Sequence, residues 1–197
     1  REWIQWCPPA FRNATIDSIG EHDPDVMRTL KEAVMESSRT GLPCSLMIGS
    51  KGYRDNANNS VLPKGKTWAI YAYISELSRR GVITDPMRQV IMISEEDILD
   101  KNTNWKDSGS FMREVFDDDH RLVIVENINS DAGLMKRSKY GMDAWGRFIN
   151  AADGREAGII MSYSGDYYSK LNEDARENVS KLMSNAKEAI LTRGVGA

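Results

Sequence analysis

Short apolar runs alternate with segments of helical periodicity along most of this chain. The apolar runs cover residues 44–50, 89–93, 122–125 and 159–161, and a further short run follows at 189–191. Apolar side chains recur every three or four positions within 23–39, 68–77, 94–99, 111–116, 140–153 and 173–187, which predicts helices there and leaves 102–110 as a polar loop. Continuous apolar strands separated by helices are typical of a parallel sheet covered on both faces. The pattern therefore predicts an α/β domain.

Residues before the first long helix differ in character from the rest. Residues 1–22 are rich in aromatic side chains and proline at their start, so we expect an extended N-terminal lead laid over the domain. Asp23 then stands at an N-cap position, with Pro24 at the first helical position, which starts the domain proper at 23–197. Because the chain begins with Arg1 rather than methionine, we expect that a portion has been removed from a longer protein.

Composition narrows the class of protein. The 197 residues suit one domain, and 41% hydrophobic with 28% charged residues is ordinary for a soluble protein. The net charge of −3 shows no overall excess of basic residues of the kind that binds nucleic acid, so any DNA contact must come from local basic patches. Two cysteines and two histidines without paired spacing exclude the usual structural zinc sites. The sequence shows neither a membrane-spanning run nor a signal peptide, which favours the cytosol with reduced thiols.

Phosphate chemistry is indicated where the first predicted strand leads into a helix. Gly65-Lys66-Thr67 stands at the helix start, where lysine can reach β- and γ-phosphates, threonine can bind Mg²⁺ and free N–H groups face anions. The full motif, G-x-x-x-x-G-K-[ST], requires glycine where this chain has Ser60. A polar insertion over 51–59 separates the strand-end Gly49 from the tripeptide. The residues expected to contact nucleotide are Ser60, Lys64, Gly65, Lys66, Thr67 and Trp68; the alternative is a solvated loop.

A second strand ends in an acid, as Mg²⁺-dependent phosphate chemistry requires. Residues 121–127 form an apolar run that closes with Glu126-Asn127, so Glu126 is the candidate for holding Mg²⁺ together with Thr67. Two alternatives stay open. Glu126 can be an ordinary acid at a strand end, or the working acid can be one of Asp117, Asp118 and Asp119.

The order of these segments resembles the AAA+ ATPase domain of bacterial and phage replicative-helicase loaders, and that of the helper ATPases of certain transposons. The residues that carry the resemblance are 8–15, 45–49, 65–67, 90–99, 121–127, 148–151 and 158–162. The resemblance implies a three-layer P-loop NTPase fold with a mainly parallel five-stranded sheet. It also implies ATP or ADP with Mg²⁺ as ligands, a replicative DNA helicase and single-stranded DNA as partners, self-assembly into oligomers or filaments, no membrane, and the cytoplasm of a bacterial host.

Carried over residue by residue, the resemblance has four departures. The glycine-rich loop is replaced by Ser60 and the insertion. Asn127 stands where a second, water-activating acid belongs, and Tyr163 stands where the sensor segment has asparagine. Lys181 takes the place of the trans-acting arginine finger and lacks its planar fork, with Arg176 and Arg193 as substitutes. We therefore expect Lys66, Glu126, Asn127 and Lys181 to carry a slow hydrolysis.

The expected function is a phage-encoded helicase loader that places a replicative helicase on single-stranded DNA. A transposition helper ATPase is one alternative, and a nucleotide-binding interaction module without catalysis is another. Loop residues that can meet DNA phosphates or bases, or else are solvated charges, are Lys101, Trp105, Lys106, Lys136, Arg137 and Lys139.

Overall fold

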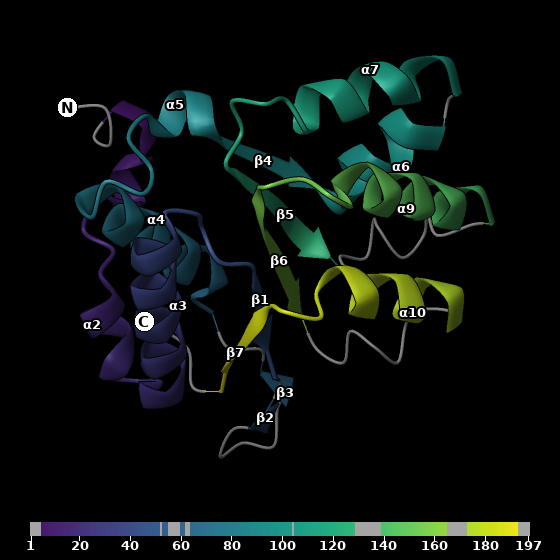
Figure 1. Ribbon diagram of the computed structural model, residues 1–197. Helices are drawn as coiled ribbons and strands as arrows, with labels where there is room; N and C mark the ends of the chain where they lie inside the picture. The colour runs from purple at the N-terminus through teal and green to yellow at the C-terminus, as the bar shows by residue number, and fades with distance from the viewer. Residues whose placement is uncertain are drawn as a thin grey trace.

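Five parallel strands form one sheet between two layers of helices in the computed structural model (Figure 1). The structure describes residues 5–51, 53–54, 60–61, 64–103, 105–128, 139–164 and 173–192. The strands are β1 (Leu46–Ser50), β4 (Val90–Ser94), β5 (Leu122–Ile128), β6 (Gly158–Ser164) and β7 (Lys187–Leu191), in the spatial order β4-β5-β6-β1-β7. The predicted α/β class with a mainly parallel five-stranded sheet is confirmed.

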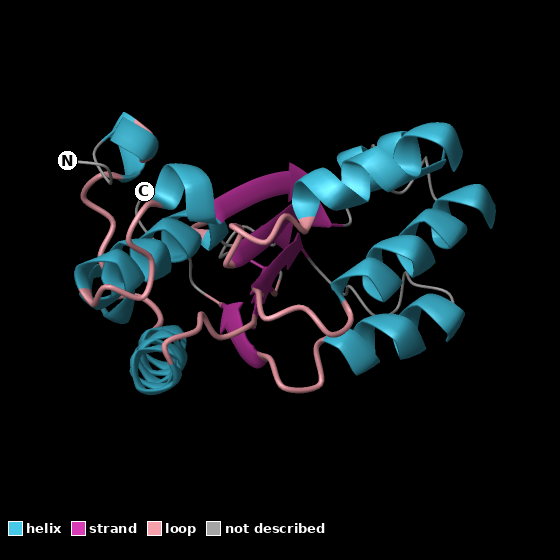
Figure 2. Ribbon diagram, turned by 45° about the horizontal axis from the view of Figure 1, so that its top comes forward, coloured by secondary structure: helices cyan, strands magenta, loops and turns pink. Residues whose placement is uncertain are grey.

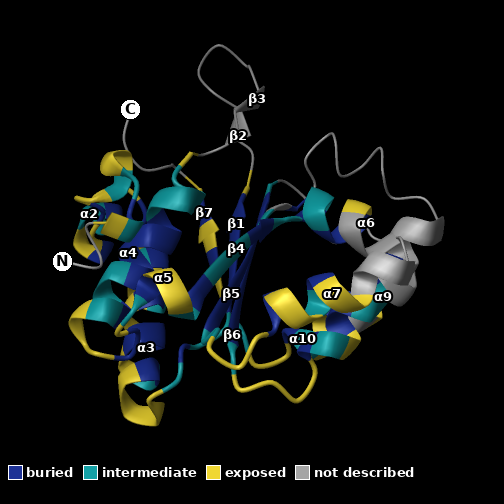
Figure 3. Ribbon diagram, turned by 90° about the horizontal axis from the view of Figure 1, so that it is seen from above, coloured by how far each residue is buried: buried dark blue, intermediate teal, exposed yellow. Residues whose placement is uncertain are grey.

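Helices cover the two faces of this sheet separately (Figure 2). One layer holds α2 (Ile16–Gly20), α3 (Pro24–Thr40) and α4 (Lys66–Arg79), and the other holds α6 (Glu95–Thr103), α7 (Trp105–Val115), α9 (Lys139–Ala152) and α10 (Glu173–Leu182). In β1, β4, β5 and β6, alternate residues enter two different cores: in β5, Ile124 packs with α3 and α4, whereas Val123 and Val125 pack with α6 and α9. These four strands are largely buried between the layers, whereas β7 leaves Glu188 and Ile190 exposed, and Figure 3 shows exposed residues along β7.

The short elements complete the chain. A 3-10 helix, η1 (Pro9–Phe11), precedes α2, and α5 (Pro86–Gln89) precedes β4. β2 (Tyr53–Arg54) and β3 (Ser60–Val61) form a separate antiparallel hairpin between β1 and α4, where the sequence predicts an insertion. The hairpin projects away from the main sheet (Figure 1).

The N-terminal lead is more structured than expected. Residues 16–20 are helical rather than extended. Thr15 caps α2, because its Oγ1 accepts a hydrogen bond from Ser18 N at 3.2 Å. Ile16 and Ile19 are buried in the core beneath α3 and α4 and stabilise the helix there. Asp23 does hold the N-cap position of α3, but its carboxylate accepts from Thr192, with an Oγ1–Oδ1 distance of 2.7 Å. The domain boundary at residue 22 stays a prediction.

Two predicted helix limits are wrong for tertiary reasons. Residues 105–110, expected as a polar loop, begin α7, because Phe111 and Val115 anchor the helix in the core and each added helical residue then gains a hydrogen bond. The last helix was expected to reach residue 187 but ends at Leu182. Lys187 N instead donates to Ser45 O at 3.1 Å and opens β7 beside β1.

One arginine joins two parts of the α3–α4 layer to the sheet. Arg121, just before β5, donates to the carbonyl of Val82 at 2.9 Å and also to the carbonyl of Gly41, the C-cap residue of α3. A cation at a helix C-terminus satisfies carbonyl groups that have no partner within the helix. This contact fixes α3 against β5 at the edge where the strands begin.

Candidate functional site

The candidate site lies where the parallel strands end. β1 leads into α4 on one face of the sheet, and β6 leads through α10 into β7 on the other side of β1. In doubly wound folds, ligands bind at the carboxyl ends of strands where such connections diverge. Ser50 is the last residue of β1 and Glu126 lies near the end of β5, and both share the strand alternation that faces α4.

Gly65 sets the direction in which α4 begins. It is the N-cap residue with φ of 118°, a left-handed conformation that suits glycine and strains other residues, and its carbonyl accepts from Ala69 N at 2.8 Å. α4 therefore starts at Lys66 with no side-chain cap on its first N–H groups. Free N–H groups at the start of a fourteen-residue helix favour an anion.

Lys66 is half-buried beside the end of β1. Its Nζ donates to Ser50 Oγ at 3.1 Å. Burial lowers the pKa of the Lys66 ammonium, because desolvation disfavours the charged form. An anionic ligand at this edge would offset that desolvation by bringing an opposite charge to the ammonium.

Glu126 is the corresponding acid. Burial raises the pKa of its carboxyl, again by disfavouring the charged form. Glu126 in turn contributes to the raised pKa of Tyr71, after burial, so the carboxylate lies within electrostatic range of α4. Tyr71 follows Thr67 by four residues and therefore shares its face of the helix.

The donor set fits Mg²⁺. Thr67 offers a hydroxyl in the first turn of α4, and Glu126 offers a carboxylate that faces the same helix. Hard oxygen donors of these two kinds, with water and phosphate oxygens, are the ligands that Mg²⁺ prefers. Among the residues whose placement is described, no cluster of three or more histidines, cysteines and acids forms a ready metal cage.

Solved structures share the fold of this domain. The crystal structure of the DnaC helicase loader matches 94% of this chain and 100% of its own, with a TM-score of 0.62 and 13% sequence identity. The chain has the AAA+ P-loop fold. The resemblance to helicase-loader ATPase domains is thus confirmed for the fold.

Two structures of the replication initiator DnaA match as well. One is bound to AMPPCP and single-stranded DNA, and the other is AMPPCP-bound DnaA from Aquifex aeolicus. Each matches 93% of this chain with a TM-score of 0.58, at 18% and 17% identity respectively. This chain spans about half of either DnaA chain, at 51%. At the level of sequence, neither a protein-family model nor a curated protein matches it.

The other residues that the sequence predicts as nucleotide contacts or catalytic residues lie in several different surroundings. Trp68 turns towards the N-terminal lead: its Nε1 donates to Ser18 Oγ at 3.0 Å and its ring meets Phe11 edge-on, with centroids 6.3 Å apart. Lys64 is exposed just before α4. The backbones of Ser60 and Asn127 belong to β3 and β5, and their side chains lie outside the part of the structure that is described.

Tyr163, at the expected sensor position, has a specific partner that the sequence did not indicate. Its hydroxyl donates to Glu188 Oε1 at 2.7 Å, from β6 across β1 to β7. A Cβ on Gly49 would come within 2.4 Å of the Tyr163 ring, so the side chain passes over that glycine. The ring packs in the α9–α10 core, on the opposite face of the sheet from Lys66.

Lys181 lies at the opposite edge of the sheet from Lys66. It is exposed and lines a cavity of about 410 Å³ with Ser45, Ile159 and Ala186, which immediately precede or begin their strands. The sheet therefore separates Lys181 from the nucleotide site of its own chain. Arg176 and Arg193, the alternatives to Lys181, have side chains outside the described part.

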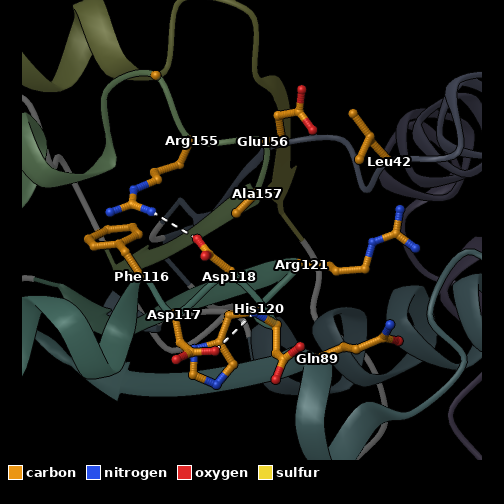
Figure 4. A pocket seen from close by; sticks show the side chains of 12 residues that line it. Leu42, Gln89, Phe116, Asp117, Asp118, His120, Arg121, Arg155, Glu156 and Ala157 are labelled. Carbon is orange, nitrogen blue, oxygen red and sulfur yellow. Dashed lines mark hydrogen bonds and ion pairs between the residues drawn. The ribbon is translucent and has the colours of Figure 1, made fainter.

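Asp117, Asp118 and Asp119 occupy that far edge too. They precede β5 and line a cavity of about 540 Å³, where Asp118 pairs with Arg155 at 3.3 Å (Figure 4). Asp119 pairs with Arg88 at 2.7 Å. Their position at the start of β5 excludes them as partners of Lys66 and leaves Glu126 as the candidate acid.

The candidate DNA contacts fall outside the described part of the structure. Lys136 and Arg137 lie outside the described residues, as do the side chains of Lys101, Trp105, Lys106 and Lys139. Within the described ranges, no helix is both long and apolar enough to cross a bilayer.

Proposed function

We propose that this domain binds ATP with Mg²⁺ and acts as a phage-encoded loader that helps place a replicative helicase on single-stranded DNA in the bacterial cytoplasm. The observation that carries the nucleotide assignment is the half-buried Lys66 ammonium at the uncapped start of α4, beside the end of β1. The helicase assignment draws support from the match along the full length of the DnaC helicase loader.

Each residue of the site has a distinct part in binding. The N–H groups that begin α4 and the Lys66 ammonium bind phosphate oxygens, while Gly65 leaves the approach clear. Thr67 and Glu126 would hold Mg²⁺, which, when bound, supplies positive charge to the phosphate oxygens. Burial of Lys66 and Glu126 strengthens these interactions, because charges attract more strongly where water is excluded.

Hydrolysis is proposed to be slow. Asn127 can hydrogen-bond a water molecule but cannot take its proton. Tyr163 directs its hydroxyl to Glu188, away from the α4 face on which the site lies. An ATP-bound state that persists suits a loader, because assembly on DNA needs binding and turnover only resets it.

Calorimetric titration with ATP and Mg²⁺ tests the assignment. Wild type is expected to bind saturably, and Lys66→Ala to abolish the signal. Lys31→Ala is the matched control. It removes an exposed lysine of α3 that pairs with Asp17 of α2, and it is expected to bind ATP as wild type does. Equal affinity of Lys66→Ala and wild type would refute the nucleotide site.

The loader assignment needs its own assay. The ATP-bound protein is mixed with its host's replicative helicase and single-stranded DNA, and helicase on the DNA is measured with wild type and with Lys66→Ala. Stimulation by wild type alone supports the assignment. Stimulation of a transposase instead, with none of the helicase, would favour the transposition helper.

A further inference from the structure

Ser50 closes β1 at the one point where that strand meets Lys66. It is 1% exposed, and its Oγ accepts from Lys66 Nζ at 3.1 Å across a sequence separation of sixteen residues. The fifteen residues between them include the β2–β3 hairpin, which stands where a short glycine-rich loop would otherwise hold the lysine close to the strand. A side-chain hydrogen bond thus links Lys66 to the sheet despite the long connection.

The backbone that carries Ser50 is held on both sides. Ser50 is in register with Ser164 of β6 and with Leu191 of β7, and the next amide, Lys51 N, donates to Leu191 O at 3.0 Å. On the opposite face, the Tyr163 ring covers Gly49 and is fixed by its bond to Glu188. The serine hydroxyl is therefore a rigid acceptor at the end of a central strand.

We propose that Ser50 is a positioning residue of the nucleotide site, whose hydroxyl holds the Lys66 ammonium in the orientation that meets the β- and γ-phosphates. The inference rests on the proposed nucleotide binding. An ammonium has three N–H donors, so one can stay on Ser50 while two remain for phosphate oxygens. The hydroxyl is uncharged and leaves the positive charge of Lys66 available to the ligand.

The expected gain in ATP affinity comes from the ordering of the Lys66 side chain before the ligand binds. A lysine side chain loses much of its rotamer entropy when it is fixed in one geometry. When Ser50 already orders Lys66 in the empty site, less side-chain entropy is lost on binding, so the affinity for the phosphate ligand rises through preorganisation. The contribution should be specific to phosphate, because Lys66 has no role towards the nucleoside.

The experiment compares Ser50→Ala, Ser50→Thr and wild type in calorimetric titrations with Mg²⁺-ATP, inorganic tripolyphosphate and adenosine. Ser50→Ala should weaken ATP and tripolyphosphate about 3- to 10-fold, the range of one hydrogen bond, and leave adenosine unchanged. Ser50→Thr keeps the hydroxyl and should restore affinity. In nucleotide-free protein, the Lys66 Nζ order parameter from NMR should fall in Ser50→Ala and recover in Ser50→Thr.

Ser45→Ala is the matched control. Ser45 Oγ accepts from Ile159 N at 3.0 Å at the other end of β1, so this variant loses a serine hydrogen bond far from Lys66 and should keep wild-type ATP affinity. Unchanged or tighter ATP binding by Ser50→Ala, or an equal loss for adenosine, would overturn the positioning role while Lys66→Ala still abolished binding. Absence of ATP binding by wild type would refute the proposed function itself, and the inference with it.

Discussion

At the scale of single residues, the site combines two half-buried groups of opposite charge, Lys66 and Glu126. Burial lowers the pKa of Lys66 and raises that of Glu126, so both groups are held at an energetic cost in the nucleotide-free domain. A site built to receive a charged ligand commonly reduces the stability of the empty protein. Lys66 keeps one neutral acceptor, Ser50, which offsets part of its desolvation.

Lys66→Met should therefore stabilise the empty domain while it abolishes ATP binding. Because the folded pKa of Lys66 lies below its unfolded value, the unfolded chain binds more protons between the two, and wild-type stability rises with pH there. The Tm advantage of Lys66→Met at pH 7 should shrink as the pH approaches 10.5, the ordinary pKa of a lysine side chain. Thermal unfolding of both proteins from pH 7 to 10.5 measures it; an advantage that grows with pH would contradict it.

Asn127→Asp tests the slow hydrolysis. A carboxylate at this position can take a proton from water, and general base assistance contributes about 10²–10⁴-fold in rate. We expect a faster turnover with single-stranded DNA and helicase present, at nearly unchanged ATP affinity. Asn127→Ser, which adds no base, is the control. Brisk wild-type turnover that Asn127→Asp slows would show that Asn127 does not stand at the water-activating position.

At the scale of elements, the connection from β1 to α4 is the feature in which this chain departs most from a standard P-loop. A β-hairpin occupies it, paired within a two-stranded sheet of its own rather than with the five-stranded sheet. β1 is fixed by β6 and β7, and α4 by its apolar face, independently of the hairpin. The hairpin is thus expected to be an addition to the fold rather than part of its core.

Replacing residues 52–63 by a short glycine-rich linker should leave the domain folded. Long surface insertions cost little in loop-closure entropy, about 0.6 kcal/mol for each doubling of length, so their removal changes stability only slightly. Circular dichroism and thermal unfolding measure the outcome, and ATP titration shows whether the shorter loop still admits nucleotide. Loss of cooperative unfolding would show that the hairpin is structural.

At the scale of the whole molecule, the two candidate catalytic cations occupy opposite edges of the sheet. Lys66 follows the carboxyl end of β1, whereas Lys181 lies beside the residues that precede β1 and β6. A five-residue strand spans roughly 15 Å, which is too far for both cations to contact one phosphate group. A role for Lys181 in hydrolysis therefore requires a second copy of the chain, as in the self-assembly that the resemblance to helicase-loader ATPase domains implies.

Mixing two inactive variants tests that role. Lys66→Ala lacks the phosphate-binding lysine, and Lys181→Ala lacks the cation offered to a neighbour. In a mixed assembly, an intact Lys66 site can receive Lys181 from the adjacent copy, so partial ATPase activity should return. The Lys66→Ala/Lys181→Ala double variant mixed with Lys66→Ala is the control and should stay inactive. A Lys181→Ala variant with wild-type turnover would exclude Lys181 from hydrolysis.

Local sequence signals determined much of the fold and the start of the site. Apolar runs and helical periodicity predicted the α/β class, and Gly65-Lys66-Thr67 marked the beginning of α4, because helix starts and strand burial depend on neighbouring residues. The order of the segments also indicated the AAA+ P-loop fold that solved structures share. These features need no knowledge of which distant residues meet.

Tertiary structure alone decided the features that depend on strand order. β7 forms from residues assigned partly to a helix, because β1 supplies its hydrogen-bond partners. Because β6 and β7 flank β1, the Tyr163 hydroxyl reaches Glu188 across Gly49. Ser50, before the hairpin, likewise meets Lys66, which follows it. Lys181 and Asp117–Asp119 are likewise separated from Lys66 by the direction of the strands. Such contacts join residues far apart in the chain, and sequence periodicity carries no information about them.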